Sequence, residues 1–179
     1  MFIPLVEKRR SIRRFLKKQV EPEKIETLIE AALRSPSSMG KNSWEFIVVT
    51  DPGLLEQLSR AKPMGSAFLK DAPLAIVVCA DPGKSDVWVE DASIASAFIL
   101  LAAESIGLGG CWIQIRERMH SETQSSGAYI AEILNIPERI RVEAIMAVGY
   151  PDEKKAPRNK SELQYEKVYL DAYGKGYRR

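Results

Sequence analysis

Residues 87–115, VWVEDASIASAFILLAAESIGLGGCWIQI, form the stretch that decides the fold. Residues 87–106 are apolar nearly all round a helix and rich in Ala and Ser, with few acidic residues. A helix that is apolar all round is buried in the protein. The glycines that follow provide a helix cap and a turn, and residues 111–115 have the apolar composition of a strand. The stretch therefore predicts a central buried helix that leads into a strand.

The sequence on either side alternates between helical and strand patterns. Residues 21–33 place apolar side chains at helical spacing, with acids in the first turn and Pro36 just beyond the end. Strands are predicted at 44–50, 72–80 and 142–148, and short helices at 54–61 and 129–134. No repeat, low-complexity tract or linker divides the chain. We therefore expect one domain, residues 1–179, of the α+β class, with about four strands and a layer of buried helix.

The C-terminal tail, from Asp152 onward, is polar but carries large side chains. They are Tyr165, Val168, Tyr169, Leu170, Tyr173 and Tyr177. Little chain remains beyond them to cover these groups, so we expect the tail to pack against another subunit.

Composition narrows the class of protein. The chain has 179 residues and a formal net charge of +2, too small to predict binding to nucleic acid or to an anionic membrane. No apolar run is long enough to span a membrane, and the first residues do not resemble a signal peptide. The two cysteines, Cys79 and Cys111, lie in apolar runs without a CxxC pair or nearby His residues. We expect a soluble cytoplasmic protein with two buried, inert thiols and no metal site.

The densest chemical signal is the segment RRSIRRF, residues 9–15, which holds four guanidinium groups and one hydroxyl. Guanidinium groups bind phosphate through two hydrogen bonds at once, and a serine hydroxyl adds a further donor. A solvated basic surface is the alternative explanation of the same residues.

Two weaker signals are a polar loop at residues 35–44 and the glycine cluster at residues 107–110. Each could approach a ligand through its backbone, but a plain connection and a helix cap explain them as well. The patterns GxGxxG, GxxxxGK[ST] and HExxH are absent. The single histidine, His120, lies in a polar stretch, and we assign it no role.

Four segments in this order resemble the FMN-dependent nitroreductase family. They are RRSIRRF at 9–15, SPSSMGKNSWEF at 35–46, WVEDASIASAFILLAAESIGLGGCWI at 88–113 and VGYPDEKKAPR at 148–158. The resemblance implies a nitroreductase-like fold with a central, mainly antiparallel sheet. It also implies a homodimer that holds FMN at the subunit interface, with the helix after Trp88 at the centre of the dimer and the C-terminal tail on the partner.

The resemblance also implies which residues hold the cofactor. Arg9, Arg10 and Ser11 match the positions that bind the phosphate and ribityl oxygens. Arg13 matches the cation beside the flavin pyrimidine, where it stabilises the negative charge of reduced flavin. Arg158 matches the late basic residue that completes the phosphate site, and Lys160 is the other candidate.

Two further groups of residues follow from the same resemblance. Pro36, Ser37, Ser38, Met39 and Asn42 match a loop that reaches the flavin from the partner subunit. Asn42 stands where relatives often carry Gln, and Gly40 stands where many carry Asn, so two contacts differ from the family pattern. Ile113 and Gln114 match the backbone beside flavin N5, and Gly110 would allow close passage.

The resemblance predicts an oxidoreductase that takes hydride from NADH or NADPH at flavin N5 and passes electrons to a small organic acceptor, such as a nitroaromatic or a quinone, in a ping-pong sequence. FMN carries the chemistry, so no catalytic side chain is predicted. A non-catalytic flavin-binding or redox-sensing protein would share the same motifs. A basic interaction module that uses the 9–14 segment is a third possibility. The acceptor and the choice between NADH and NADPH stay open.

Overall fold

The computed structural model describes residues 2–177 and contains one four-stranded antiparallel sheet with the strand order β1-β2-β4-β3. The strands are β1 (Trp44–Val49), β2 (Leu74–Ala80), β3 (Gly109–Gln114) and β4 (Arg141–Gly149). All three neighbouring pairs are antiparallel. The predicted α+β class, the number of strands and the mainly antiparallel sheet are confirmed.

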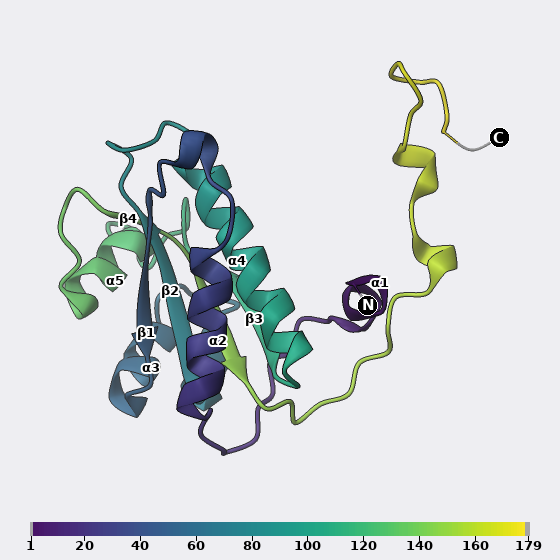
Figure 1. The fold of residues 1–179 in the computed structure, drawn as a ribbon. Coiled ribbons are helices and arrows are strands. Elements are labelled where there is room, and N and C mark those ends of the chain that lie inside the picture. The colour runs from purple at the N-terminus through teal and green to yellow at the C-terminus, as the bar shows by residue number, and fades with distance from the viewer. Residues whose placement is uncertain (1, 178–179) are drawn as a thin grey trace.

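Five α-helices and four short 3-10 turns occur among the described residues. The helices are α1 (Phe2–Lys8), α2 (Pro22–Leu33), α3 (Pro52–Ser59), α4 (Trp88–Ser105) and α5 (Ser126–Leu134), and the turns are η1 (Ser38–Gly40), η2 (Ala67–Asp71), η3 (Lys160–Glu162) and η4 (Tyr165–Lys167). Helices α2 and α4 cover one face of the sheet, and α3 and α5 cover the other (Figure 1). The sheet is thus the middle layer of three.

The core has two halves, one on each face of the sheet. Side chains of β2 alternate between them: Ile76 packs with α2 and α4, and Val77 packs with α3 and α5. Every residue of β2 is buried because the strand has a neighbour on each edge and helices on each face. This double cover explains why residues 72–80 read as one continuous apolar run.

Helix α4 is covered by its own chain on one face only. Ala95 and Ile99 are fully buried against the sheet, but Ile94 and Phe98 are each 38% exposed on the opposite face. The expected central helix is therefore buried by this chain on one side. The apolar pattern runs all round the helix, yet the chain itself covers only one side of it.

Helix α1 and the tail lie apart from the layered body (Figure 1). Phe2 and Ile3 of α1 are each more than 60% exposed, and no side chain in residues 151–177 is buried. The ion pair between Lys8 Nζ and Glu104 Oε1, 3.2 Å long, holds α1 near the C-terminal end of α4. Among residues 2–177, no helix is both long and apolar enough to cross a membrane.

Candidate functional site

The segment that carries the arginines, residues 9–15, is an extended arm fixed along the edge of β3. The Ile12 amide donates to the Gly110 carbonyl over 3.0 Å, and Ser11 forms an isolated parallel bridge with Gly110. The Leu16 amide then donates to the Tyr150 carbonyl over 2.9 Å, at the end of β4. The arm is thereby held by backbone contacts at both ends.

Glycine at position 109 is required for this approach. A Cβ on Gly109 would lie 2.7 Å from Cγ1 of Ile12 and 2.9 Å from its Cβ, distances that real Cβ contacts do not show. Ile12 itself is buried, with 6% of its surface exposed. The glycine cluster of the sequence therefore does more than cap α4, since it also makes room for the arm.

The chain after β4 crosses the arm and fixes its polar groups. Glu153 accepts hydrogen bonds from the backbone amides of Arg13, over 2.6 Å, and Arg14, over 3.2 Å. Lys155 Nζ donates to the Ser11 carbonyl over 2.6 Å and pairs with Glu153 over 3.3 Å. Burial raises the pKa of Glu153, but the Arg13 amide and Lys155 together outweigh burial, so its pKa is lowered overall. Glu153 is thus held ionised beneath the arm.

The guanidinium groups of the arm are left largely without carboxylate partners. Arg10 donates to the carbonyl of Ala156 and, together with Arg158, lines a pocket of about 380 Å³. Arg9 and Arg158 make no ion pair within residues 2–177. Lys160, the other predicted candidate, does not line this pocket. Glu162 also lines this pocket but makes no ion pair with either arginine. Guanidinium groups without an ion-pair partner are suited to bind a phosphate group.

Two residues that the sequence did not indicate, Lys62 and Phe68, lie near Gln114 and Arg13. Lys62 Nζ donates to the Gln114 carbonyl over 3.0 Å, and burial together with the charge of Arg118 lowers the pKa of Lys62. The guanidinium of Arg13 lies 5.9 Å from the ring centroid of Phe68, in η2. Cys111 is buried beside the arm, and burial raises the pKa of its thiol.

Lys62 and Phe68 escaped sequence reasoning for a simple reason. Lys62 and Phe68 belong to a loop punctuated by Gly and Pro, where no periodicity marks a side chain as buried or functional. Ile113 is buried, as the central position of a strand requires, whereas Gln114 is only half-buried at the end of β3. Through its hydrogen bond to the Gln114 carbonyl, Lys62 reaches the end of β3, where the resemblance places the flavin.

The second predicted group, the loop at residues 36–42, lies elsewhere. The Ser38 amide donates to Asp91 Oδ1 over 2.8 Å, which holds the loop at the start of α4. Ser37 Oγ donates to the side-chain oxygen Oδ1 of Asn42 over 2.7 Å, and the backbone amide of Asn42 donates to Ser37 Oγ over 3.0 Å. Met39 has φ 53° and is 88% exposed. The loop therefore presents Met39 outward, on a backbone that is fixed from below.

Within one chain the structure does not bring this loop to the arm. The loop is anchored at the first turn of α4, whereas the arm runs past the other end of that helix (Figure 1). An α-helix of 18 residues, the length of α4, is about 27 Å long. The predicted residues thus form two separate groups, one at each end of α4.

The fold and these two groups define an α+β protein with an arginine-rich arm beside its sheet, and the comparisons with known proteins name its class. The profile of the Nitroreductase family matches residues 6–62 and 55–150. The chain therefore belongs to the nitroreductase family of oxidoreductase enzymes, as the sequence predicted.

Individual relatives agree with this assignment. The chain is similar to the structure of an FMN-dependent nitroreductase from Clostridium difficile R20291, with 48% identity and a TM-score of 0.94 over 96% of this chain and 99% of that one. It is 39% identical over 160 residues, 86% of this chain and 87% of the other, to an Archaeoglobus fulgidus protein named "Putative NADH dehydrogenase/NAD(P)H nitroreductase". It also resembles the NADPH:FMN oxidoreductase of Vibrio harveyi in complex with NAD+, at 26% identity and TM-score 0.80 over 96% and 77% of the two chains.

Proposed function

We propose that this chain is an FMN-dependent oxidoreductase that uses NADH or NADPH to reduce a small organic acceptor, in a ping-pong sequence, as a homodimer with FMN at the subunit interface. The observation that carries the proposal is the pocket that Arg10 of the arm lines together with Arg158, where neither guanidinium makes an ion pair within residues 2–177. Arg9, which precedes Arg10 in the arm, also makes no ion pair within that range. The names of the relatives supply the cofactor and the donor.

The residues at the arm fit FMN by the chemistry of their donors. Arg9, Arg10, Ser11 and Arg158 would bind the phosphate and the ribityl chain, since guanidinium and hydroxyl groups are phosphate donors. Lys155 helps by fixing the carbonyl of Ser11, which orients the arm. Bound FMN would supply the redox chemistry, accepting hydride from the nicotinamide and passing electrons to the acceptor.

The residues near Gln114 would set the electrostatics of the reacting end. Arg13 and Lys62 place two positive charges at the arm and at the end of β3, where they would stabilise negative charge on a reduced cofactor. Gly110, Ile113 and Gln114 would border the flavin through their backbone. In this arrangement no side chain has to act as a nucleophile.

The geometry of α4 supports a site shared by two chains. The exposed apolar face of α4 carries Ile94 and Phe98, and two such faces packed antiparallel would place the loop of one chain beside the arm of the other. Pro36, Ser37, Ser38, Met39 and Asn42 would then complete the site of the partner. The exposed tail, residues 151–177, would cover the second subunit as well.

The proposal includes the cytoplasm as the place of action and residues 1–179 as one domain. Both cysteines are free thiols buried in the core, and burial raises the pKa of Cys79 to about 12, so both suit a reducing compartment.

The test is the visible spectrum of the purified protein, with mass identification of whatever denaturation releases. We expect a flavin spectrum, release of FMN, bleaching by NADH or NADPH without oxygen, and recovery of colour when a nitroaromatic or a quinone is added. Sedimentation should give twice the chain mass of 20.1 kDa. A folded protein that stays colourless and takes up no FMN would refute the proposal. Flavin that no nicotinamide reduces would indicate a non-catalytic flavin-binding protein instead.

A further inference from the structure

The start of helix α4 forms a buried polar junction around one carboxylate. Asp91, in the first turn of α4, is 2% exposed. Its Oδ1 accepts a hydrogen bond from the Ser38 amide over 2.8 Å, and its Oδ2 accepts from the hydroxyls of Ser43, over 3.5 Å, and Ser85, over 3.3 Å. Both of these serines are buried as well. A buried carboxylate is costly unless it is hydrogen-bonded, so the three donors stabilise it and are held by it in turn.

The loop at residues 36–42 needs such a support because its backbone is strained. Met39 has φ 53° and Asn42 has φ 46°. Positive φ is uncommon in residues with a side chain, and it persists only where the surrounding structure holds it. Two backbone amides and the side chain of Asn42 form hydrogen bonds within the loop itself. The hydrogen bond from the Ser38 amide to Asp91 is what ties the loop to the helix.

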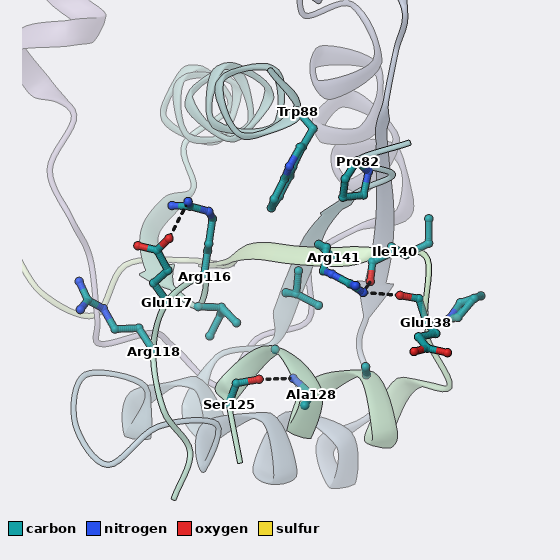
Figure 2. A pocket seen from close by; sticks show the side chains of 15 residues that line it. Pro82, Trp88, Arg116, Glu117, Arg118, Ser125, Ala128, Glu138, Ile140 and Arg141 are labelled. Atoms are coloured by element: carbon teal, nitrogen blue, oxygen red, sulfur yellow. Dashed lines mark hydrogen bonds and ion pairs between the residues drawn. The ribbon is translucent and has the colours of Figure 1, made fainter. Parts of the chain in front are cut away.

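The helix that carries Asp91 is itself fixed on the sheet. Trp88, three positions earlier, projects from the start of α4 toward the sheet and packs on the core (Figure 2). Ala95 and Ile99, four and eight positions after Asp91, are fully buried. Residues at this spacing share one side of a helix. Asp91 therefore stands on the packed face of α4, where it can fix the loop against a rigid element.

The same helix carries the contacts of the proposed homodimer. Ile94 and Phe98 lie on the exposed face of α4, opposite the face that packs on the sheet. In the proposed dimer these side chains would meet the partner, while Asp91 holds the loop of its own chain from the other side of the helix. One rigid element thus sets both where the two chains meet and where the loop stands.

We propose that Asp91 is a positioning residue for the flavin site of the partner subunit, because it holds the loop at residues 36–42 in the conformation that reaches across the interface. The inference rests on the proposed function, which places this loop beside the FMN of the other chain. Asp91 itself touches no cofactor and acts only through the loop. A carboxylate suits this role because hydrogen bonds to a charged acceptor are stronger than those to a neutral one.

The test is Asp91→Asn, which keeps the shape of the side chain and replaces its charged acceptor with a neutral amide. Hydrogen exchange of the Ser38 amide should become about tenfold faster, and the dissociation constant of FMN in equilibrium dialysis should rise about tenfold. The sedimentation mass should stay that of the parent. The matched control is Asp86→Asn, since Asp86 is exposed and meets the loop only through a 3.8 Å ion pair with Lys41; it should leave exchange and affinity unchanged.

A second control separates positioning from a general loss of stability. Ile99→Val opens a small cavity in the core beneath the same helix, so it should lower the unfolding free energy and leave the exchange of the Ser38 amide and the affinity for FMN unchanged. If Asp91→Asn does not fold, Ser85→Ala removes one donor and keeps the charge, and it should change both quantities in the same direction by a smaller factor.

The possible results divide clearly between the two proposals. Unchanged exchange or unchanged affinity in Asp91→Asn, or an equal loss of affinity in Ile99→Val, would overturn the role of Asp91 and leave the proposed function standing. A parent protein that binds no FMN would refute the proposed function, and the role of Asp91 with it.

Discussion

Replacing Gly109 by Ala tests whether the arm is packed against β3 as described. The added methyl group would lie 2.7 Å from Cγ1 of Ile12, whose side chain is buried and has no room to retreat. Overpacking of this kind costs about 1 to 3 kcal/mol. Alanine also restricts the unfolded chain more than glycine does, which stabilises the folded state by about 0.4 to 1 kcal/mol. The middle of each range gives a net expected loss of unfolding free energy of about 1.3 kcal/mol.

Urea denaturation followed by circular dichroism measures this loss, and flavin fluorescence measures the affinity for FMN. We expect the unfolding free energy and the affinity for FMN both to fall, because moving Ile12 also moves Ser11 and its bridge to Gly110. The matched control is Gly127→Ala, since a Cβ at Gly127 meets nothing within 4 Å and the position lies in α5. That change should stabilise the protein by about 0.5 to 1 kcal/mol. A Gly109→Ala variant as stable as its parent, with unchanged FMN affinity, would contradict the close packing of the arm.

Three further predictions follow from single contacts. Arg9→Ala should weaken FMN binding by about 1.5 to 3 kcal/mol in equilibrium dialysis, whereas the control Arg34→Gln should leave it unchanged. Unchanged affinity in Arg9→Ala would show that Arg9 does not bind the phosphate. Burial raises the pKa of Glu143 above the ordinary 4.5, so ionisation of this carboxyl destabilises the fold as pH rises through the raised pKa. The unfolding free energy of Glu143→Gln minus that of its parent should therefore be larger at pH 8 than at pH 4.5. A difference that does not change with pH would contradict this prediction. Phe98→Asp places a charge on the exposed face of α4 and should shift the sedimentation mass toward 20.1 kDa, whereas an intact dimer would show that this face is not the interface.

Much of the fold could be predicted from the sequence because its periodicities are strong. Residues 72–80 form one apolar run, and the structure places a strand there from Leu74 to Ala80 with every residue buried. Helix α2 begins at Pro22, one residue after the predicted start, because a proline in the first turn and an acid beside it favour that end. Helix α1 was missed, since its seven residues are too few to show an amphipathic pattern and none of them is buried.

The candidate site was predictable only in part. The arm stood out because clustered arginines contrast with a nearly neutral chain, and the structure fixes that arm beside β3. Lys62 and Phe68 gave no such signal. Their loop brings Lys62 to Gln114 and Phe68 to Arg13 through tertiary contacts, which sequence spacing does not encode. The bulge in β4 at Glu143, where β2 register steps from Val78 to Cys79, likewise left no mark in the sequence.

The separation of arm and loop to the two ends of α4 has a genetic consequence. A chain with a defective arm still carries a sound loop, and a chain with a defective loop still carries a sound arm. In the proposed dimer, mixing the two inactive mutants and allowing subunits to exchange would create hybrids with one fully wild-type site and one doubly damaged site. Random exchange would make about half of the dimers hybrids, so about a quarter of all sites would regain activity. Two dead mutants would thus complement each other.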